Sequence, residues 1–186
     1  MSPRLFLPLL SIFACFTAAS CSSTATLAKT ASKPAGKSVQ GEKPAKLKRG
    51  SQEIVRTTAY THLEKDSLPY GKKNAAGTQL KYGKVRSAAA DWSVYPLGTV
   101  FKIEGQPYLY EVDDYGSALV GTETIDLYKP SFGKMNDWGV RHVPIKVVKW
   151  GDYDKSLHLL SGRTHAKHCR EMYYSIKNKK EKGARG

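Results

Sequence analysis

The chain of 186 residues is long enough for one domain with tails, and its composition, 40% hydrophobic and 25% charged, is typical of a soluble globular protein. The formal charge of +14 is unusual, but it lies in the flanks: residues 1–50 carry +7, residues 51–151 carry +2 and residues 152–186 carry +5. Basic flanks favour contact with an anionic surface such as lipid head groups or wall polymers, and they do not define a specific site.

Residues 1–20 have the three-part pattern of a secretory signal peptide: one arginine, an apolar run over residues 5–16, and then three small residues. These small residues, directly before Cys21, resemble the bacterial lipobox, which implies cleavage before Cys21 and lipid attachment to its thiol. The alternative is ordinary signal cleavage, with Cys21 incidental. If Cys21 is acylated, Cys169 is the one cysteine left in the mature chain, and no internal disulfide forms.

Residues 21–50 are rich in Ala, Ser, Thr, Lys, Gly and Pro and contain no aromatic residue. Such a segment cannot bury enough apolar surface to order itself, so the sequence predicts a disordered, flexible basic linker between membrane and domain. A tail that binds nucleic acid is the alternative. Because an exported chain rarely meets nucleic acid, we expect no such partner.

The domain is predicted over residues 51–151, where six short runs of branched and aromatic residues alternate with turn residues. The runs cover residues 54–61, 85–90, 100–103, 108–112, 124–128 and 143–150. Turn signals roughly every ten residues favour a closed barrel over an open sheet. One helix is predicted over residues 130–138, where Phe132 and Met135 share a face and Gly139 marks the end. The expected class is therefore mainly β, with six strands and one short helix.

Two acids lie where they could carry chemistry. Asp114 follows the run over residues 108–112, and Asp126 lies between Ile125 and Leu127 inside a strand. Because side chains alternate along a strand, Asp126 points to the face opposite its apolar neighbours. Partial burial there raises the pKa of a carboxyl group toward values that suit a general acid. The alternative is a solvated strand acid or a structural ion pair.

Several short motifs follow one another at regular separations in this chain. They are Thr58-Ala59-Tyr60, Ala76-Gly77-Thr78, Ala90-Asp91, Tyr95-Pro96-Leu97-Gly98, Asp114-Tyr115-Gly116-Ser117-Ala118, Gly121, Ile125-Asp126-Leu127-Tyr128 and Trp138-Gly139-Val140-Arg141. Together they resemble the three-aspartate (3D) domain, which is related to the C-terminal part of the membrane-bound lytic transglycosylase A family. The resemblance covers residues 54–150, and it implies a six-stranded double-psi β-barrel that cleaves the glycan strands of peptidoglycan.

The three aspartates of the family pattern fall on Asp91, Asp114 and Asp126. The resemblance implies that Asp126 is the catalytic acid/base, and that Asp114 and Asp91 line its groove and tune it. Asp91 has an alternative role as a loop cap or ion-pair member. Thr78 has the alternative of closing its own turn. The substrate-binding positions that the resemblance implies are Tyr60, Thr78, Gly116 and Ser117.

The implied activity is lytic transglycosylation, which cleaves the MurNAc–GlcNAc glycosidic bond, forms 1,6-anhydro-MurNAc and serves cell-wall turnover. One carboxyl group can serve both steps, whereas the usual hydrolases of O-glycosyl bonds need a pair. The alternatives are a non-catalytic module that binds peptidoglycan in the same groove, and a hydrolase whose water is activated by Asp114 or Asp91. The family sequence Asp-Thr-Gly-Gly is Asp114-Tyr115-Gly116-Ser117 here, so we expect groove shape and substrate preference to differ.

Residues 152–186 are predicted to form a basic, partly helical tail that contacts anionic polymer or lipid. Residues 163–180 fit a helix with His165, His168 and Cys169 on one face, but one helix rarely supplies a whole metal site, and we expect no metal or cofactor. The expected protein is a monomeric lipoprotein of the cell envelope, anchored at the periplasmic face of the outer membrane or otherwise secreted. Its expected partners are peptidoglycan glycan strands and, through the anchor, the membrane.

Overall fold

The structure, a computed structural model, describes residues 52–184, and these residues belong to one compact unit of the chain. The predicted signal peptide, Cys21 and the linker over residues 21–50 lie outside the described residues. In this described part, no helix combines the length and the apolarity that crossing a bilayer requires.

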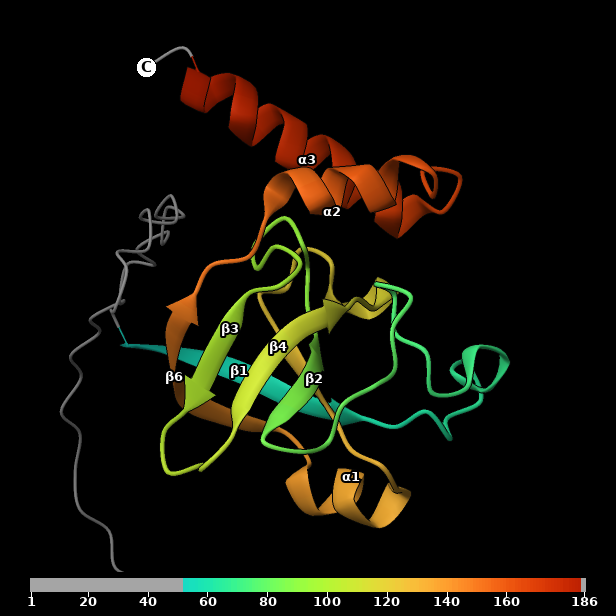
Figure 1. Cartoon of the computed structure of the whole chain (residues 1–186), viewed down its shortest axis with the longest axis vertical. Helices are drawn as coiled ribbons and strands as arrows, with labels where there is room; N and C mark the ends of the chain where they lie inside the picture. The colour runs from blue at the N-terminus through green and yellow to red at the C-terminus, as the bar shows by residue number, and fades with distance from the viewer. Residues whose placement is uncertain (1–51, 185–186) are drawn as a thin grey trace, which may run out of the picture. The chain divides into compact units, whose positions relative to one another are not determined.

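The described residues contain six strands, and their ends lie within two residues of the predicted runs. The strands are β1 (Gln52–Tyr60), β2 (Val85–Ala89), β3 (Val100–Ile103), β4 (Leu109–Asp114), β5 (Ile125–Tyr128) and β6 (Arg141–Lys149). They pair in the order β1-β5-β2-β4-β3-β6, and β6 pairs back with β1, so the barrel is closed (Figure 1). The pairs β1–β5 and β2–β4 are parallel and the other four are antiparallel. The mainly-β class with six strands is therefore confirmed.

Alternation along the strands separates a buried inner face from an outer face. In β5, Ile125 and Leu127 are 0% exposed and belong to the core, whereas Asp126 between them is partly exposed. Other strands contribute to the same core through the buried side chains of Val55, Ala88, Phe101, Tyr110, Val112, Ile145 and Val147. The alternation that predicts Asp126 on the outer face is thus observed, since its two neighbours point into the core.

The predicted helix is present as α1 (Phe132–Trp138), at one end of the barrel (Figure 1). The Ser131 hydroxyl accepts a hydrogen bond from the backbone N–H of Lys134 and caps its first turn. At the other end Gly139 has a φ of 59°, a conformation that a residue without a Cβ adopts readily. Trp138 is 8% exposed and packs into the core cluster.

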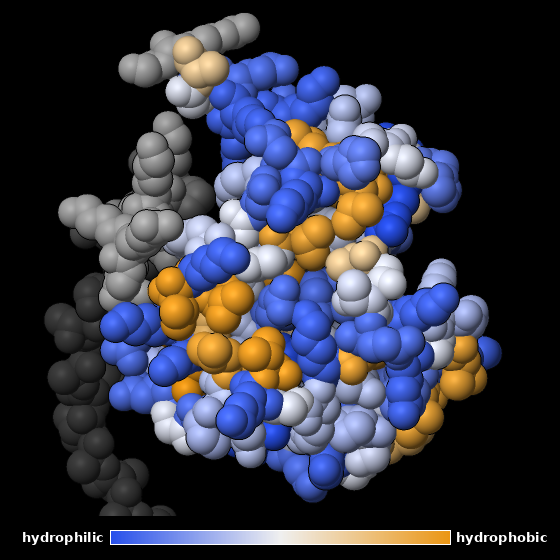
Figure 2. Space-filling model, in the orientation of Figure 1, coloured by the Kyte–Doolittle hydropathy of each residue, from blue (hydrophilic) through white to orange (hydrophobic). Residues whose placement is uncertain are grey.

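Beyond residue 151 the sequence predicts a basic, partly helical tail, and the structure has helices there that contribute to the core of the domain. That segment forms α2 (Tyr153–Ser161) and α3 (Lys167–Ala184), which pack on the end of the barrel opposite α1 (Figure 1). Their inner side chains are at most 1% exposed and share the core cluster of the barrel: Leu160, Cys169, Met172 and Ile176. Figure 2 shows the resulting contrast, with hydrophobic side chains where the helices meet the barrel and hydrophilic ones over the outer side of the helices.

A close backbone approach joins the barrel to α2. A Cβ at Gly151 would lie 2.2 Å from the carbonyl oxygen of Pro96 and 2.6 Å from the backbone nitrogen of Thr99, so this position requires glycine. The Asp152 side chain then accepts hydrogen bonds from the backbone N–H groups of Asp154 and Lys155, which starts the helix.

Candidate functional site

Asp114 and Asp126 lie on the outer face of the barrel, on either side of one small residue. Strand β2 runs between β4 and β5, and its Ala89 pairs with Asp114 on one side and with Asp126 on the other. Directly paired residues project to the same face of a sheet. Two strand spacings separate the Cα atoms of the two acids by about 10 Å. Ala89, which is 4% exposed, places only a methyl group between the two acids on this face.

A β-bulge brings Asp114 to this face. Ala88 pairs with Val112, but the next residue, Ala89, pairs with Asp114, so Asp113 has no direct partner on β2. Without the extra residue Asp113 would occupy the position opposite Ala89. Asp113 is instead 2% exposed, accepts a hydrogen bond of 2.8 Å from the Ser87 hydroxyl and lies 3.1 Å from the Lys81 ammonium. The bulge thus assigns the two neighbouring acids different surroundings.

The Asp126 carboxyl is desolvated and holds one short hydrogen bond. Thr58, its direct partner on β1, donates from its hydroxyl to Oδ1 at 2.7 Å. Burial raises the pKa of Asp126 to about 6, and the negative charges of Glu64 and Asp114 add to the rise. The Thr58 hydrogen bond and the charge of Arg56 act in the opposite direction. Near pH 6 this carboxyl group therefore exists in both protonation states, as a general acid/base requires.

The Asp114 carboxyl is held more firmly. Its Oδ2 accepts a hydrogen bond of 2.9 Å from the Tyr60 hydroxyl, and its Oδ1 accepts from the backbone N–H groups of Ala75 (3.0 Å) and Tyr115 (2.9 Å). Burial raises the pKa of Asp114 to about 6, against the effect of these three hydrogen bonds. Burial and the nearby Asp114 also raise the pKa of Tyr60 well above its usual range, so Tyr60 keeps its proton and remains a donor.

Asp91, the third acid of the family pattern, has backbone partners for both of its oxygens. It is 3% exposed; Oδ1 accepts from the N–H of Ser93 at 2.8 Å and Oδ2 from the N–H of Gly121 at 2.9 Å. These bonds tie the turn after β2 to the loop before β5. The arrangement agrees with the alternative of a loop cap and does not place Asp91 beside Asp126.

Of the substrate-binding positions implied by the resemblance, one contacts Asp114 and the others lie in turns. Tyr60 is at the site, bonded to Asp114. Thr78 closes its own turn, because its N–H donates to Asn74 Oδ1 at 2.8 Å and its hydroxyl also bonds to the Asn74 side chain. Gly116 precedes the short 3-10 helix Ser117–Leu119, and Ser117 is exposed at its start. A Cβ at Gly116 would lie 3.3 Å from Leu119, which makes a tight fit in that turn.

Two side chains outside the predicted set support the site. Thr58 contacts Asp126 directly, and its place two residues before Tyr60, on the same strand face, is a signal that could have identified it. Arg163, between α2 and α3, donates to the carbonyl oxygen of Ala75 at 2.8 Å and to the Tyr115 hydroxyl at 3.2 Å. No local pattern marks Arg163, because its partners lie on distant segments.

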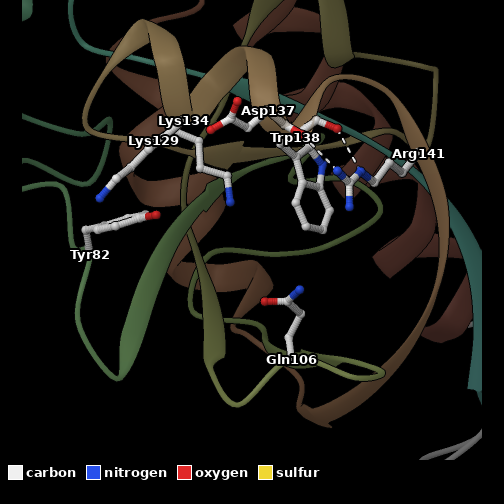
Figure 3. Close-up of a pocket in the computed structure, with 7 residues that line it drawn as sticks. All are labelled: Tyr82, Gln106, Lys129, Lys134, Asp137, Trp138 and Arg141. Carbon is white, nitrogen blue, oxygen red and sulfur yellow. Dashed lines mark hydrogen bonds between the residues drawn. The ribbon is translucent and has the colours of Figure 1, made fainter.

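A row of aromatic rings leads away from the two acids. The Tyr60 and Tyr128 ring centroids are 5.6 Å apart, and those of Tyr128 and Tyr82 are 6.3 Å apart. The Tyr128 hydroxyl lies 2.8 Å from Nδ1 of His62. At Tyr82 the row reaches an open pocket of about 290 Å³, lined by Tyr82, Gln106, Lys129, Lys134, Asp137, Trp138 and Arg141 (Figure 3). Tyr128 is only 3% exposed, so the row is mainly internal packing, and Tyr82 at its end is the ring that lines the pocket.

The helix face considered for metal binding is part of the core. Cys169 is 1% exposed and belongs to the core cluster, and the imidazole of His168 packs 5.6 Å from the Tyr115 ring. Among residues 52–184, no three His, Cys, Asp or Glu side chains are grouped as a metal site would require.

Comparison with known proteins finds a family match for the central part of the barrel. The family model of the 3D domain matches residues 86–149, which run from β2 to β6 and include Asp91, Asp114 and Asp126. The resemblance to the 3D domain is thereby confirmed, and the relation to the C-terminal domain of the lytic transglycosylase A family is consistent with it. Strand β1, with Thr58 and Tyr60, lies outside the matched segment. No curated protein matches the chain.

Proposed function

We propose that the protein is a peptidoglycan lytic transglycosylase and that Asp126 is its acid/base. The 3D domain family is associated with peptidoglycan-related, lytic transglycosylase-like function. The finer assignment to the MurNAc–GlcNAc bond, with a 1,6-anhydro product, is part of this proposal. One observation carries it: a desolvated carboxyl group with a pKa of about 6 faces a second carboxyl group across the small Ala89.

The chemistry needs one group that first gives and then takes a proton. Protonated Asp126 donates its proton to the glycosidic oxygen while the bond from the muramic C1 to that oxygen breaks. The muramic 6-hydroxyl then attacks C1 and closes the anhydro ring, and its proton returns to the Asp126 carboxylate. No water enters the product, so one acid is enough.

Asp114 and Thr58 act through Asp126 in this proposal. Ionised Asp114 raises the pKa of Asp126 and, across Ala89, faces the positive charge that develops at C1. Thr58 fixes the carboxyl orientation through its 2.7 Å hydrogen bond. Because Tyr60 and two backbone N–H groups hold Asp114, its position is set before substrate binds.

Digestion of purified sacculi with the full-length protein tests the proposal. We expect soluble muropeptides that end in 1,6-anhydro-MurNAc, identified by mass spectrometry, and we expect Asp126→Asn to lower the rate of their release by a factor of about 10²–10⁴. Asp154→Asn, a change of an exposed acid on α2, is the matched control and should leave the rate of release unchanged. Reducing ends that are one water heavier would support a hydrolase instead, and anhydro products released by Asp126→Asn at the wild-type rate would remove Asp126 from the mechanism.

A non-catalytic module that binds the wall is the second candidate. It is favoured by the location of the pocket of about 290 Å³, which is lined by Lys129 and Trp138 and not by Asp126. Binding of intact sacculi without release of soluble muropeptides would support this candidate.

We also propose the topology and cellular setting expected from the sequence. The parallel pairs β1–β5 and β2–β4 support a double-psi arrangement of the six strands. The lipobox-like sequence before Cys21 supports a lipid anchor in the cell envelope, at the periplasmic face of the outer membrane, with the protein as a monomer. Palmitate labelling of the wild type and of Cys21→Ala tests the anchor.

A further inference from the structure

The pocket beyond Tyr82 has strongly positive walls. Figure 3 shows Lys129 and Arg141 near the ring of Trp138 and Lys134 near that of Tyr82, with Gln106 on the facing turn. Asp137 is the one acid among the seven lining residues of this described pocket. Lys129 is the most informative of the cations, because only 5% of it is exposed. A lysine so deeply buried is rare unless an anion accompanies it.

Within residues 52–184, Lys129 has aromatic and cationic neighbours but no carboxylate partner. Its ammonium lies 4.5 Å from the centroid of the Trp138 ring, and the Arg141 guanidinium lies 4.6 Å from the same ring. Burial lowers the pKa of Lys129 to about 8, and the charges of Arg86, Arg141 and Lys134 lower it further. In the described residues these positive charges therefore lie close together with aromatic contacts but no ion pair at Lys129, as in a site that an anion completes.

The other cations are held in place around the opening. Lys134 lies 5.1 Å and Arg86 4.0 Å from the Tyr82 ring centroid. Arg141 is fixed by two hydrogen bonds of 2.8 Å, from Nε to the carbonyl oxygen of Trp138 and from Nη2 to that of Asp137 (Figure 3). Because these bonds occupy part of its donor fork, Arg141 offers charge more than bidentate contact. The two lysines and Arg141 thus present localised positive charges, which suit a compact anionic group such as a carboxylate.

The pocket and the candidate site are built on the same chain segment. Lys129 follows Asp126 by three residues along the same segment, a distance of about 10 Å in an extended chain. The ring of Tyr128, which is 3% exposed, packs between those of Tyr60 and Tyr82, so the two regions share one aromatic contact network. A sugar strand bound at Asp126 could thus place a substituent about 10 Å farther along the strand in the pocket.

We propose that this pocket binds a carboxylate of the peptide stem that peptidoglycan carries on its muramic acid residues. The inference rests on the proposed function and gives it a substrate preference: glycan strands that carry peptides over bare strands. Lys129 and Lys134 are the specificity-determining residues, and neither takes part in bond cleavage.

Binding to three forms of soluble, uncrosslinked glycan strands tests this. The first form carries its peptides, the second has lost them to an amidase, and the third carries peptides whose carboxyl groups are amidated. The full-length Asp126→Asn variant is used throughout, so that turnover does not alter the ligand. We expect the first form to bind about tenfold more tightly than the other two, since a hydrogen bond to a charged group contributes about that factor.

Lys129→Met, which keeps the packing on Trp138, and Lys134→Gln, an exposed change, should each remove most of this preference. Lys155→Met, an exposed lysine on α2, is the control and should retain it. Equal affinity for all three forms, or a preference that survives both variants, would overturn the inference. Tighter, lysine-dependent binding of polyphosphate would also overturn it, since the site would then serve a phosphate polymer.

These outcomes are separable from failure of the proposed function. If the wild type releases no anhydro product from sacculi but Lys129→Met still abolishes the preference for peptide-bearing strands, transglycosylation is wrong and the carboxylate site stands. If the wild type releases anhydro products from peptide-bearing and bare strands with equal KM, the carboxylate site is wrong and transglycosylation stands.

Discussion

The two acids on the outer face and the cationic pocket bury charge of opposite sign a few residues apart. On the acid side, burial raises the pKa of Asp126 to about 6; in the pocket, burial lowers that of Lys129 to about 8. Each shift favours the neutral form. Asp91 is the contrast to both, because its two oxygens accept backbone hydrogen bonds. In the described part of the chain, Asp126 and Lys129 lack backbone hydrogen bonds of this kind, so the first can exchange a proton and the second can bind a counter-ion.

The largest expected effect is on steady-state kinetics with peptide-bearing strands, where changes in the two regions should alter different constants. Asp126→Asn should lower kcat by a factor of about 10²–10⁴, because it removes the proton donor. Lys129→Met should act on KM instead, because it removes a contact made equally in the ground state and the transition state. Should Lys129→Met lower kcat as strongly as Asp126→Asn does, the separation between chemistry and recognition would be wrong.

The sequence predicts Asp126 well because a single strand determines its position. Its apolar neighbours mark the inner face, so the outer face follows from alternation alone. Asp114 is less accessible to such reasoning, because a bulge in the pairing of β2 and β4 decides whether it or Asp113 faces Ala89. The family pattern alone suggests a role for Asp91 in the site. Its hydrogen bond from Gly121 joins two segments that are distant in sequence, so the sequence does not predict it.

Long-range packing explains what the sequence did not predict. Lys129 reads as a polar residue at the end of a strand, and Trp138 on α1, nine residues later, covers it. The sequence predicts residues 152–186 as a basic, partly helical tail, because their charge dominates, whereas in the structure α2 and α3 share the core of the barrel. The apolar spacing of Cys169, Met172 and Ile176, one face of a helix, was nonetheless present.

Stability measured against pH should show the two regions with opposite pH dependence. The folded-state pKa of Asp126 is above its unfolded value of about 4, so its contribution is complete below pH 4 and lost as the pH rises through about 6. Asp126→Asn removes this loss, and we expect it to raise the free energy of unfolding by about 2 kcal/mol at pH 7.5 and to have little effect at pH 4.

For Lys129 the folded-state pKa of about 8 is below the ordinary lysine value of 10.5, so the folded state disfavours its charged form. Lys129→Met should therefore add about 2 kcal/mol at pH 7, and the gain should disappear as the pH approaches 10. Urea unfolding at three pH values measures both variants. A loss of stability at neutral pH in either variant would mean that its charge is compensated in the folded protein.

The smallest expected effect concerns the hydrogen bond between Thr58 and Asp126. Because this bond favours the ionised carboxyl, Thr58→Val should raise the pKa of Asp126 by about half a unit to one unit. A ¹³C NMR titration of the Asp126 carboxyl carbon measures the shift directly. Thr57→Val, a change at the neighbouring inward-facing residue of β1, is the control for nonspecific effects. A pKa that falls in Thr58→Val would contradict the hydrogen-bond geometry.

The pH dependence of kcat for release of anhydro-muropeptides tests the central claim most directly. If protonated Asp126 donates to the glycosidic oxygen, kcat should fall about tenfold for each pH unit above about 6. In Thr58→Val the same fall should begin at higher pH. A kcat that stays constant from pH 5 to pH 8 would contradict the assignment of Asp126 as the acid.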